Sequence, residues 1–268
     1  MMDFSNMRSK QKVFEQILKM ANDNDVKAMC LNGSLANPHV GSDHYQDYDI
    51  VCIVDEIESW IDDRKWISSL GTIALMQTPD EERRSDINNK PWDSYAFLML
   101  FDDGVRIDLT LLRLDGICME HRWDSLSVVL MDQIGIFDSI LPADDRDYWI
   151  KKPTLNEFRD CCNEFWWCLP NVAKGIARNQ LPYAMSMYHR IVHKELDRMI
   201  EWYIGMQHDF RLTTGKWGKY FNQYLSKALF DQYEKTFSDA TLSHFWQAVF
   251  HSVALFEEVA HAVSEHFQ

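Results

Sequence analysis

Hydrophobic and polar positions follow one pattern in the first half of this 268-residue chain and another in the second. Before residue 142, short apolar runs are separated by Gly, Pro, Asn and Asp, which is typical of strands joined by turns. Two stretches, 4–22 and 57–70, instead have apolar residues at helical spacing. The pattern predicts a mixed sheet accompanied by helices. The predicted strands are 26–31, 49–54, 72–76, 95–101 and 105–112.

Beyond residue 154 the apolar residues recur at helical spacing only. Thr154 and Glu157 match a capping box, so a helix is expected to begin between them. We therefore predict an α+β protein, with a mixed β-sheet domain at 1–141 and a helical bundle domain at 142–268. The bundle helices are expected at 155–177, 182–203, 220–237 and 242–267.

A Gly-Ser pair follows the first predicted strand. Gly33 permits a tight turn and lets the phosphates of a ligand approach the backbone, and Ser34 is a suitable cap for a following helix. The free N–H groups at the start of a helix bind anions. The pair therefore predicts a phosphate site.

Two acids stand at the head of the next predicted strand. Asp47 and Asp49 are two residues apart, so in a strand their side chains share one face, about 6.5–7 Å apart. Both carboxylates can then reach toward one hard cation or a close pair of cations. A phosphate cradle beside paired acids is what magnesium-dependent nucleotidyl transfer needs. The other interpretation is that they only cap and turn the chain.

A third acid lies inside the predicted strand 105–112. The turn Asp102-Asp103-Gly104 predicts that this strand forms a hairpin with 95–101. Arg106, Asp108 and Thr110 share one face of it, and apolar residues occupy the other. An acid within an apolar run is costly to bury unless it is paired or bound to a metal. Asp108 is therefore either a partner of the first two acids or the salt-bridge partner of an arginine.

The combination of Gly-Ser, a spacer of this length, Asp-x-Asp and a later third acid resembles the nucleotidyltransferase superfamily. Motifs such as Gln-Asp-Tyr-Asp-Ile (46–50) and Arg-Ile-Asp-Leu-Thr (106–110) further resemble the aminoglycoside 6-adenylyltransferases, which adenylylate streptomycin. The resemblance covers nearly the whole chain. Its other stretches are 76–80, 98–102, 148–153, 161–167, 172–175 and 194–200.

The resemblance implies an enzyme that moves AMP from ATP to a hydroxyl of an aminoglycoside, with streptomycin the best guess. Pyrophosphate would be released, and the modification would give antibiotic resistance. In this scheme Asp47 and Asp49 hold Mg²⁺ that bridges the triphosphate of ATP. Asp108 is the third metal ligand, the general base for the acceptor hydroxyl, or both.

Four further positions have expected roles. Glu164 is the rival general base, because it lies on the first bundle helix, where it can face a cleft, and Lys174 resembles the phosphate-contacting lysine of related enzymes. The alternative for both residues is a solvated position on the helix surface. Ser34 and the backbone of Gly33 would contact the β- and γ-phosphates. The family usually has arginine after Gly-Ser, whereas this chain has Leu35, so that phosphate contact is not carried over.

The charge balance limits the partners. The 27 basic and 41 acidic residues give a net charge of −14, which argues against a nucleic-acid binder because phosphates would be repelled. The same charge suits a polycationic substrate, although it also serves simply to keep a protein dissolved. No apolar run is long enough to span a bilayer or to act as a signal peptide, so we expect a cytoplasmic location. A monomer is compatible with the sequence, which does not fix the oligomeric state.

Other residues that carry chemistry have simpler interpretations. The six cysteines lack metal-ligand spacing and are expected to be buried, reduced thiols. His189 and His193 are four residues apart on a predicted helix, but no acid motif flanks them, so a surface or cleft position is favoured over zinc binding. The pair Trp166-Trp167 is expected in the bundle core or in the wall of a cleft.

Two alternatives to the enzyme stay open. One is a non-catalytic nucleotide-binding regulatory or partner-binding protein on the same scaffold, with Leu35 marking lost chemistry. Retention of all three acids argues against it, since such a protein has no chemical need for them. The other is a nucleotidyltransferase that uses a different small-molecule or protein acceptor.

Overall fold

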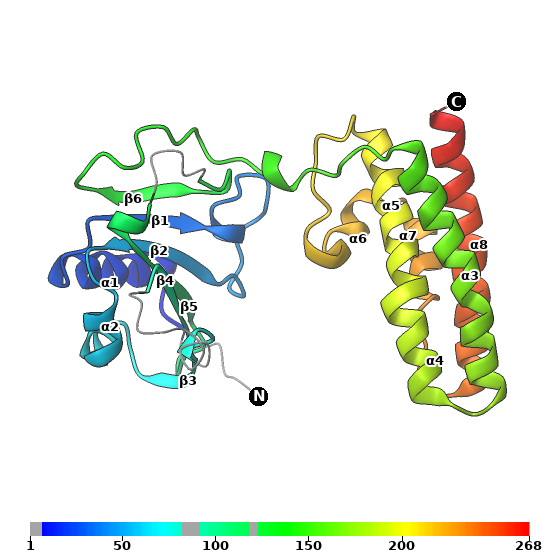
Figure 1. Cartoon of the computed structure of the whole chain (residues 1–268), viewed down its shortest axis with the longest axis horizontal. Coiled ribbons are helices and arrows are strands. Elements are labelled where there is room, and N and C mark those ends of the chain that lie inside the picture. Colours follow the sequence, from blue (N-terminus) through cyan, green and yellow to red (C-terminus); the bar gives the residue numbers. More distant parts are fainter. Residues whose placement is uncertain (1–6, 82–91, 118–122, 268) are drawn as a thin grey trace. The chain divides into compact units, whose positions relative to one another are not determined.

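The computed structural model divides the chain into two compact units, Met1–Asp147 and Tyr148–Gln268 (Figure 1). It describes residues 7–81, 92–117 and 123–267. The charged composition of residues 80–93 predicts a loop or short helix there, and most of this segment lies outside the described ranges. The first unit contains a mixed sheet with helices, and the second is helical. The predicted α+β fold class is confirmed.

The first unit is built on a six-stranded sheet with the order β3-β4-β5-β2-β1-β6. β2 and β5 are parallel, and the other neighbouring strands are antiparallel, including the predicted hairpin of β4 and β5. The five predicted strands all form, with ends shifted by one or two residues. The strands are β1 (Ala28–Asn32), β2 (Tyr48–Val54), β3 (Ile73–Gln77), β4 (Ser94–Phe101), β5 (Arg106–Arg113) and β6 (Val128–Asp132).

Strand β6 has no counterpart among the predicted strands. It lies at the edge of the sheet, pairs with β1 alone, and has a register shift opposite Met29 and Cys30. Val128 and Val129 are 38% and 40% exposed, so the strand lacks the alternation of buried and exposed positions that identifies a strand in a sequence. Its pairing depends on β1, which is almost 100 residues away in the sequence.

Helix α1 (Lys10–Asp23) covers one face of the sheet and buries Val13, Ile17, Met20 and Ala21 against it. The expected helix 4–22 was too long at its start, because Ser9 accepts a hydrogen bond from the N–H of Lys12 and caps the helix there. Residues 4–6 lie outside the described ranges.

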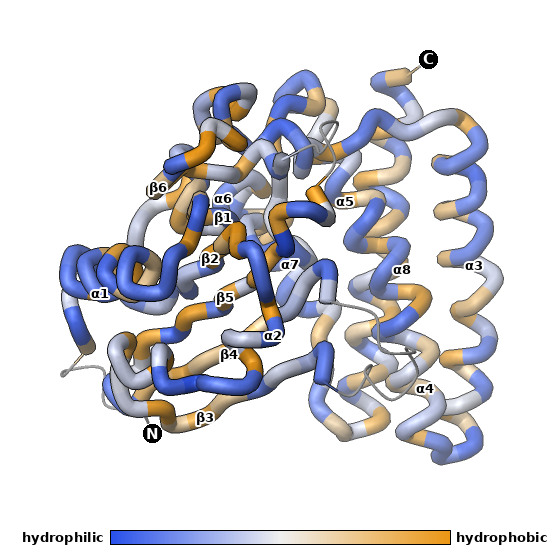
Figure 2. Tube along the Cα trace, turned by 60° about the vertical axis from the view of Figure 1, so that its left-hand side comes forward, coloured by the Kyte–Doolittle hydropathy of each residue, from blue (hydrophilic) through white to orange (hydrophobic). Residues whose placement is uncertain are grey.

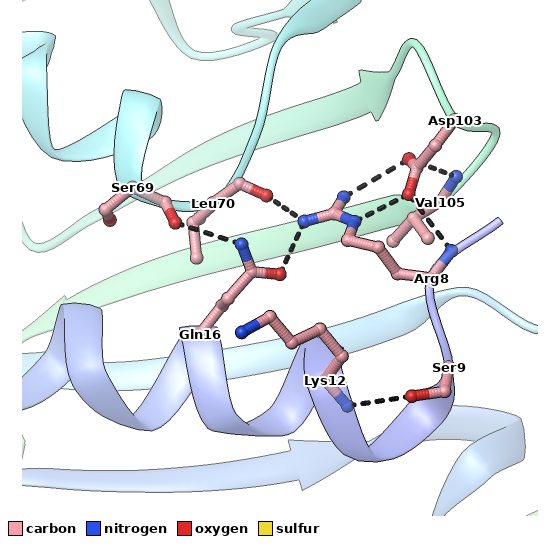
Figure 3. Close-up of polar contacts among 8 residues, drawn as sticks. All are labelled: Arg8, Ser9, Lys12, Gln16, Ser69, Leu70, Asp103 and Val105. Carbon is pink, nitrogen blue, oxygen red and sulfur yellow. Dashed lines mark hydrogen bonds and ion pairs between the residues drawn. The ribbon is translucent and has the colours of Figure 1, made fainter. Parts of the chain in front are cut away.

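Arg8 ties the segment before α1 to the sheet (Figure 3). Its guanidinium forms an ion pair of 2.6 Å with Asp103 in the β4–β5 turn, and it also donates to the side chain of Gln16 and to the carbonyl of Leu70. The Arg8 guanidinium and backbone hydrogen bonds offset the desolvation of the Asp103 carboxyl, and the pKa of Asp103 is lowered. Three separate segments of the first unit therefore meet at one side chain.

The single helix expected at 57–70 is divided in two. Helix α2 (Glu58–Asp62) ends at Asp63, which has an extended conformation and accepts a hydrogen bond from the N–H of Lys65. A 3-10 helix, Arg64–Ser69, follows. The break lets the Trp66 ring pack edge-on against Trp60, with the indole N–H donating to the Trp60 carbonyl.

The second unit consists of helices whose apolar faces form one core. Figure 2 shows hydrophobic and hydrophilic positions alternating along α3 and α8. Phe165 and Phe256 stack in this core with ring centroids 3.8 Å apart. Among the helices in the described ranges, none is both long and apolar enough to cross a membrane. The helices are α3 (Leu155–Ala177), α4 (Leu181–Met187), α5 (His193–Gln207), α6 (Phe221–Tyr224), α7 (Lys227–Glu234) and α8 (Leu242–His266).

The helix expected at 182–203 contains a π-helical turn, Tyr188–Val192, between α4 and α5. The hydroxyl of Tyr188, at its start, contacts Ser252 and the carbonyl of Thr236 inside the core. His193, directly after it, is also buried: its Nε2 contacts the hydroxyl of Thr236 and its Nδ1 lies 3.3 Å from Asp197. The surface or cleft position favoured for this histidine was wrong, because these polar partners satisfy it in the core.

Two further expectations for the second unit are refined by the structure. Trp166 and Trp167 are 42% and 74% exposed, so neither is a core residue; Phe165, directly before them, occupies the core. Trp166 lines a cavity with Phe158 and Phe256, which agrees with the alternative of a cleft wall. The helix expected at 220–237 is interrupted at Leu225, which is extended, and Ser226 caps α7 by accepting from the N–H of Leu229.

The predicted capping box at the start of α3 is present. The Thr154 hydroxyl accepts from the N–H of Glu157, and the Glu157 carboxylate accepts from the N–H of Thr154. We expect Thr154→Ala to destabilise the protein by about 1 kcal/mol, since one N–H at the helix start loses its partner. Thermal unfolding followed by circular dichroism would show this as a lower midpoint.

Thr241 offers the matched control. It is the N-cap residue of α8, but its side chain makes no cap hydrogen bond. Thr241→Ala should therefore lower the midpoint less than Thr154→Ala. Equal effects of the two substitutions would contradict a stabilising role of the capping box.

Candidate active site

Three strand ends meet at one edge of the first unit. In the antiparallel pair β1–β2, Asn32 lies opposite Asp49, and in the parallel pair β2–β5, Asp49 lies opposite Asp108. Gly33 follows β1 directly, and Asp47 directly precedes β2. The sheet register therefore brings together four of the residues singled out in the sequence.

Strand alternation decides which way the acids point. Ile50 and Leu109 belong to the core cluster that includes α1, so Asp49 and Asp108, one residue before each, lie on the opposite face. On that face Val51 and Ile53 pack against a smaller apolar cluster. The acids therefore lie just beyond the apolar side chains that cover this face of the sheet.

Gly33 makes the closest backbone approach to the acids. It has a φ of +72°, a left-handed conformation that favours glycine, and a Cβ built on it would lie 2.1 Å from the Asp49 Oδ2. No larger residue fits here without moving Asp49. The Ser127 hydroxyl donates to the Asn32 side chain over 2.9 Å and so fixes the residue before the turn.

The Gly-Ser pair does not begin a long helix. A single 3-10 turn, Gly33–Leu35, follows β1, and its N-cap residue is Asn32, without a side-chain cap bond. The expected capping of a helix by Ser34 was therefore wrong. Ser34 is half-buried, and its carbonyl accepts a hydrogen bond of 3.2 Å from Gln46. This bond connects the turn to the residue before Asp47.

The carboxyl of Asp49 is unusually hard to ionise. Its burial, with smaller contributions from the negative charges of Asp108 and Asp47, raises the pKa of Asp49 to about 6, against the lowering effect of Arg106. Such a shift arises chiefly where a carboxyl is buried, and neighbouring negative charges add to it. A cation bound beside Asp49 would favour its ionised form.

Arg106 supplies the positive charge that the described residues bring to this cluster. Its Nε and Nη2 donate to the two oxygens of Asp108 over 2.9 and 2.7 Å, and its Nη1 lies 3.6 Å from Asp47. The salt-bridge interpretation of Asp108 thus describes a contact that exists. The sequence indicated this contact, since Arg106 and Asp108 are two residues apart and share one face of a strand. Arg106 was nevertheless not predicted as a site residue.

A cavity of about 930 Å³ lies beside Asp47, although Asp49 and Asp108 do not line it. Asp47 and Arg106 line it together with Leu35, Gln46 and Arg8. A space of this size suits a small-molecule ligand. Leu35 therefore contributes an apolar side chain to the wall of a cavity beside Asp47.

Glu164 and Lys174 belong to the second unit. Both are exposed on α3, and ten residues of helix separate them by about 15 Å. Glu164 accepts a weak hydrogen bond from the Cys168 thiol. The structure thus brings together the predicted site residues of the first unit but does not bring these two side chains next to each other.

The donor set fits a hard divalent cation, because carboxylate oxygens are the ligands that Mg²⁺ prefers. The burial of Asp49 beside two other acids, and the close approach of the Gly33 backbone to it, agree with a cation and an anionic ligand at this place. In the described parts of the chain, no three His, Cys, Asp or Glu side chains stand ready to hold one metal ion together. The three acids would have to rearrange around an ion, starting from their contacts with Arg106.

Comparison with known proteins gives a consistent result. The family model for streptomycin adenylyltransferase matches residues 7–268. An aminoglycoside 6-adenylyltransferase of Campylobacter jejuni is 35% identical over 260 residues, covering 96% of this chain and 89% of that protein. One of Bacillus subtilis (strain 168) is 35% identical over 261 residues, covering 97% and 91%.

A solved structure is also similar. The crystal structure of an aminoglycoside 6-adenyltransferase from Bacillus subtilis has 31% sequence identity, covers 97% of this chain and 92% of that chain, and superposes with a TM-score of 0.44. The family match spans nearly every residue, and the relatives share about a third of their residues with this chain over almost its full length. This chain therefore belongs to the streptomycin adenylyltransferase family, a family of nucleotidyltransferase enzymes.

Proposed function

We propose that this protein transfers AMP from Mg-ATP to a hydroxyl of an aminoglycoside, with streptomycin the preferred acceptor, and releases pyrophosphate. The names of its relatives support the aminoglycoside as acceptor. The single observation that carries the proposal is the register of Asp49 with Asp108, beside the closely approaching backbone of Gly33. That arrangement offers acids for a cation and N–H groups for phosphates within one small region.

In this proposal Asp47, Asp49 and Asp108 would hold Mg²⁺, and the ion would supply positive charge against the charge that builds up on the phosphates during transfer. The backbone of Gly33 and the hydroxyl of Ser34 bind the β- and γ-phosphates. Both belong to the 3-10 turn, which the hydrogen bond from Gln46 holds close to the acids. The turn and the acids then keep the triphosphate in one position for attack by the acceptor.

The acceptor hydroxyl must lose a proton as it attacks. Asp108 is one candidate base, because it lies beside Asp49 in the sheet and is largely shielded from solvent, with a side chain 18% exposed. Glu164 is the other candidate, and its exposed side chain on α3 is open to a substrate. Lys174, also exposed on α3, is proposed to contact phosphate. A general base must come within hydrogen-bond reach of the proton that it removes.

The acceptor is proposed from charge and from family membership. With a net charge of −14, the protein attracts a polycationic molecule such as an aminoglycoside. Because ATP is the proposed donor, we propose that the protein acts in the cytoplasm. There it would inactivate streptomycin and so give resistance.

A panel of aminoglycosides tests the proposal. Each compound is incubated with the protein, ATP and Mg²⁺, and the products are analysed by mass spectrometry and pyrophosphate release. We expect streptomycin to gain one AMP. Asp49→Asn should lower the rate by about two to three orders of magnitude, because a carboxylate that would hold the metal ion beside the phosphates is lost.

Asp62→Asn is the control for this experiment. It also removes one negative charge, but from the exposed end of α2, and it should leave transfer unchanged. Full activity of Asp49→Asn would contradict the proposed mechanism. Modification of a different small molecule would change the acceptor, and ATP binding without pyrophosphate release would favour the regulatory alternative.

Gly33→Ala tests the close approach of the turn to Asp49. The added Cβ would meet Asp49 Oδ2 and would also strain a left-handed backbone, so transfer should fall about 100-fold through misplaced groups. Gly41→Ala is the matched control in the same loop, since nothing lies within 4 Å of its Cβ position. Steady-state rates with streptomycin measure both. Equal rates for the two variants would be incompatible with a role for the Gly33 backbone.

The raised pKa of Asp49 makes the stability of the metal-free protein depend on pH. Because its pKa of about 6 lies above the value of the unfolded chain, Asp49 stabilises the fold while it is protonated. That contribution is complete below the unfolded pKa and is lost as the pH rises through about 6. With metal chelated, Asp49→Asn should therefore be more stable than the parent protein at about pH 7.5, by about 1–2 kcal/mol after allowing for partial exposure.

Thermal unfolding in EDTA at about pH 5 and pH 7.5 measures this effect. The advantage of Asp49→Asn should grow as the pH rises, whereas Asp62→Asn should show no such trend. A difference between Asp49→Asn and the parent protein that is independent of pH would contradict a raised pKa at Asp49.

A further inference from the structure

Arg106 brings a positive charge to the three acids that are proposed to hold the metal ion. It forms a two-pronged hydrogen-bond pair with Asp108, lies 3.6 Å from Asp47, and its charge also acts on Asp49. The three acids carry a combined charge of −3 when ionised, and the guanidinium compensates one unit. Its contacts with two of these acids and the effect of its charge on the third distinguish it from an ordinary surface ion pair.

The pair between Arg106 and Asp108 is bidentate. Nε and Nη2 of Arg106 bond to different oxygens of Asp108, so both oxygens of that carboxylate are engaged. A bidentate arginine–carboxylate pair is stronger and more directional than a single contact. Asp108 must give up at least part of this pair before it can ligate an ion or accept a proton.

The Arg106 guanidinium is free to move toward a neighbouring cavity. The Arg106 side chain is 45% exposed, whereas that of Asp108 is 18% exposed, so the arginine is the partner with freedom to move. It lines the cavity of about 930 Å³ beside Asp47. A long, flexible side chain at the rim of a cavity can exchange one anionic partner for another at small cost.

We infer that Arg106 is a positioning residue that holds the three acids while no metal is bound and leaves them when a nucleotide brings the metal in. This inference rests on the proposed function. The phosphates of the nucleotide would give the guanidinium a new anionic partner, and the acids would then close around the ion. Metal binding and nucleotide binding thereby become coupled, because both favour the same released position of Arg106.

Binding of Mn²⁺ tests this coupling without measuring activity. The electron paramagnetic resonance signal of free Mn²⁺ is titrated with the protein, first alone and then with a non-hydrolysable ATP analogue. For Arg106→Gln alone, we expect Mn²⁺ affinity to rise about tenfold over the parent protein, because the competing cation is gone. With the analogue present, that advantage should disappear, since Arg106 has already left the acids in the parent protein.

Lys27→Gln is the matched control. Lys27 also bridges two carboxylates of the first unit, at 2.6 Å from Asp25 and 3.2 Å from Asp55, but away from the catalytic cluster. Its removal should leave Mn²⁺ affinity unchanged. Arg106→Lys keeps the charge without the two-pronged pair, so it should give an intermediate affinity, and it can be measured if Arg106→Gln does not fold.

The outcomes separate this inference from the proposed function. Unchanged or weaker Mn²⁺ binding by Arg106→Gln alone would overturn the inference, and so would a gain that is equally large with and without the analogue. In both cases AMP transfer to streptomycin by the parent protein would leave the proposed function intact. A parent protein that binds no Mn²⁺ even with the analogue, and modifies no aminoglycoside, would overturn both.

Discussion

The apolar alternation of two adjacent parallel strands is the constraint that forces two acids of the first unit to lie side by side. Asp49 and Asp108 lie side by side in β2 and β5, and their register is fixed by the apolar residues that alternate with them and pack against α1. The sheet cannot relieve the repulsion between these acids by sliding, since a shift of one residue would expose its core face. Relief must come from outside the strands, through a proton on Asp49, through Arg106 or through a bound cation.

Much of this arrangement was predictable because it depends on local patterns. Five strands, the β4–β5 hairpin and the capping box of α3 follow from alternation, turn residues and cap residues that lie close together in the sequence. The three acids and Gly33 were recognisable from their residue types and from a family resemblance. The sequence predicted Asp108 as a partner of the other two acids or of an arginine, but its register opposite Asp49 depends on the parallel pairing of β2 with β5, which are distant in the sequence.

The features that were missed depend on contacts between distant segments. Strand β6 exists through its pairing with β1, and the helix break at Asp63 lets two tryptophans pack together. His193 is buried because Thr236 and Asp197 satisfy its ring nitrogens, which the spacing of histidines on a helix cannot reveal. Arg106 was read as one residue of an alternating strand, although its contacts span two strands.

The π-helical turn Tyr188–Val192 affects how this chain should be aligned with other sequences. A π turn contains one residue more than the α turn that it replaces, and the helices on either side keep their orientation. A relative that lacks one residue here can form an unbroken helix and still present the same faces to its core. A one-residue gap between these two chains therefore belongs within 188–192, rather than in the loops that flank the helices, where alignment methods usually insert gaps.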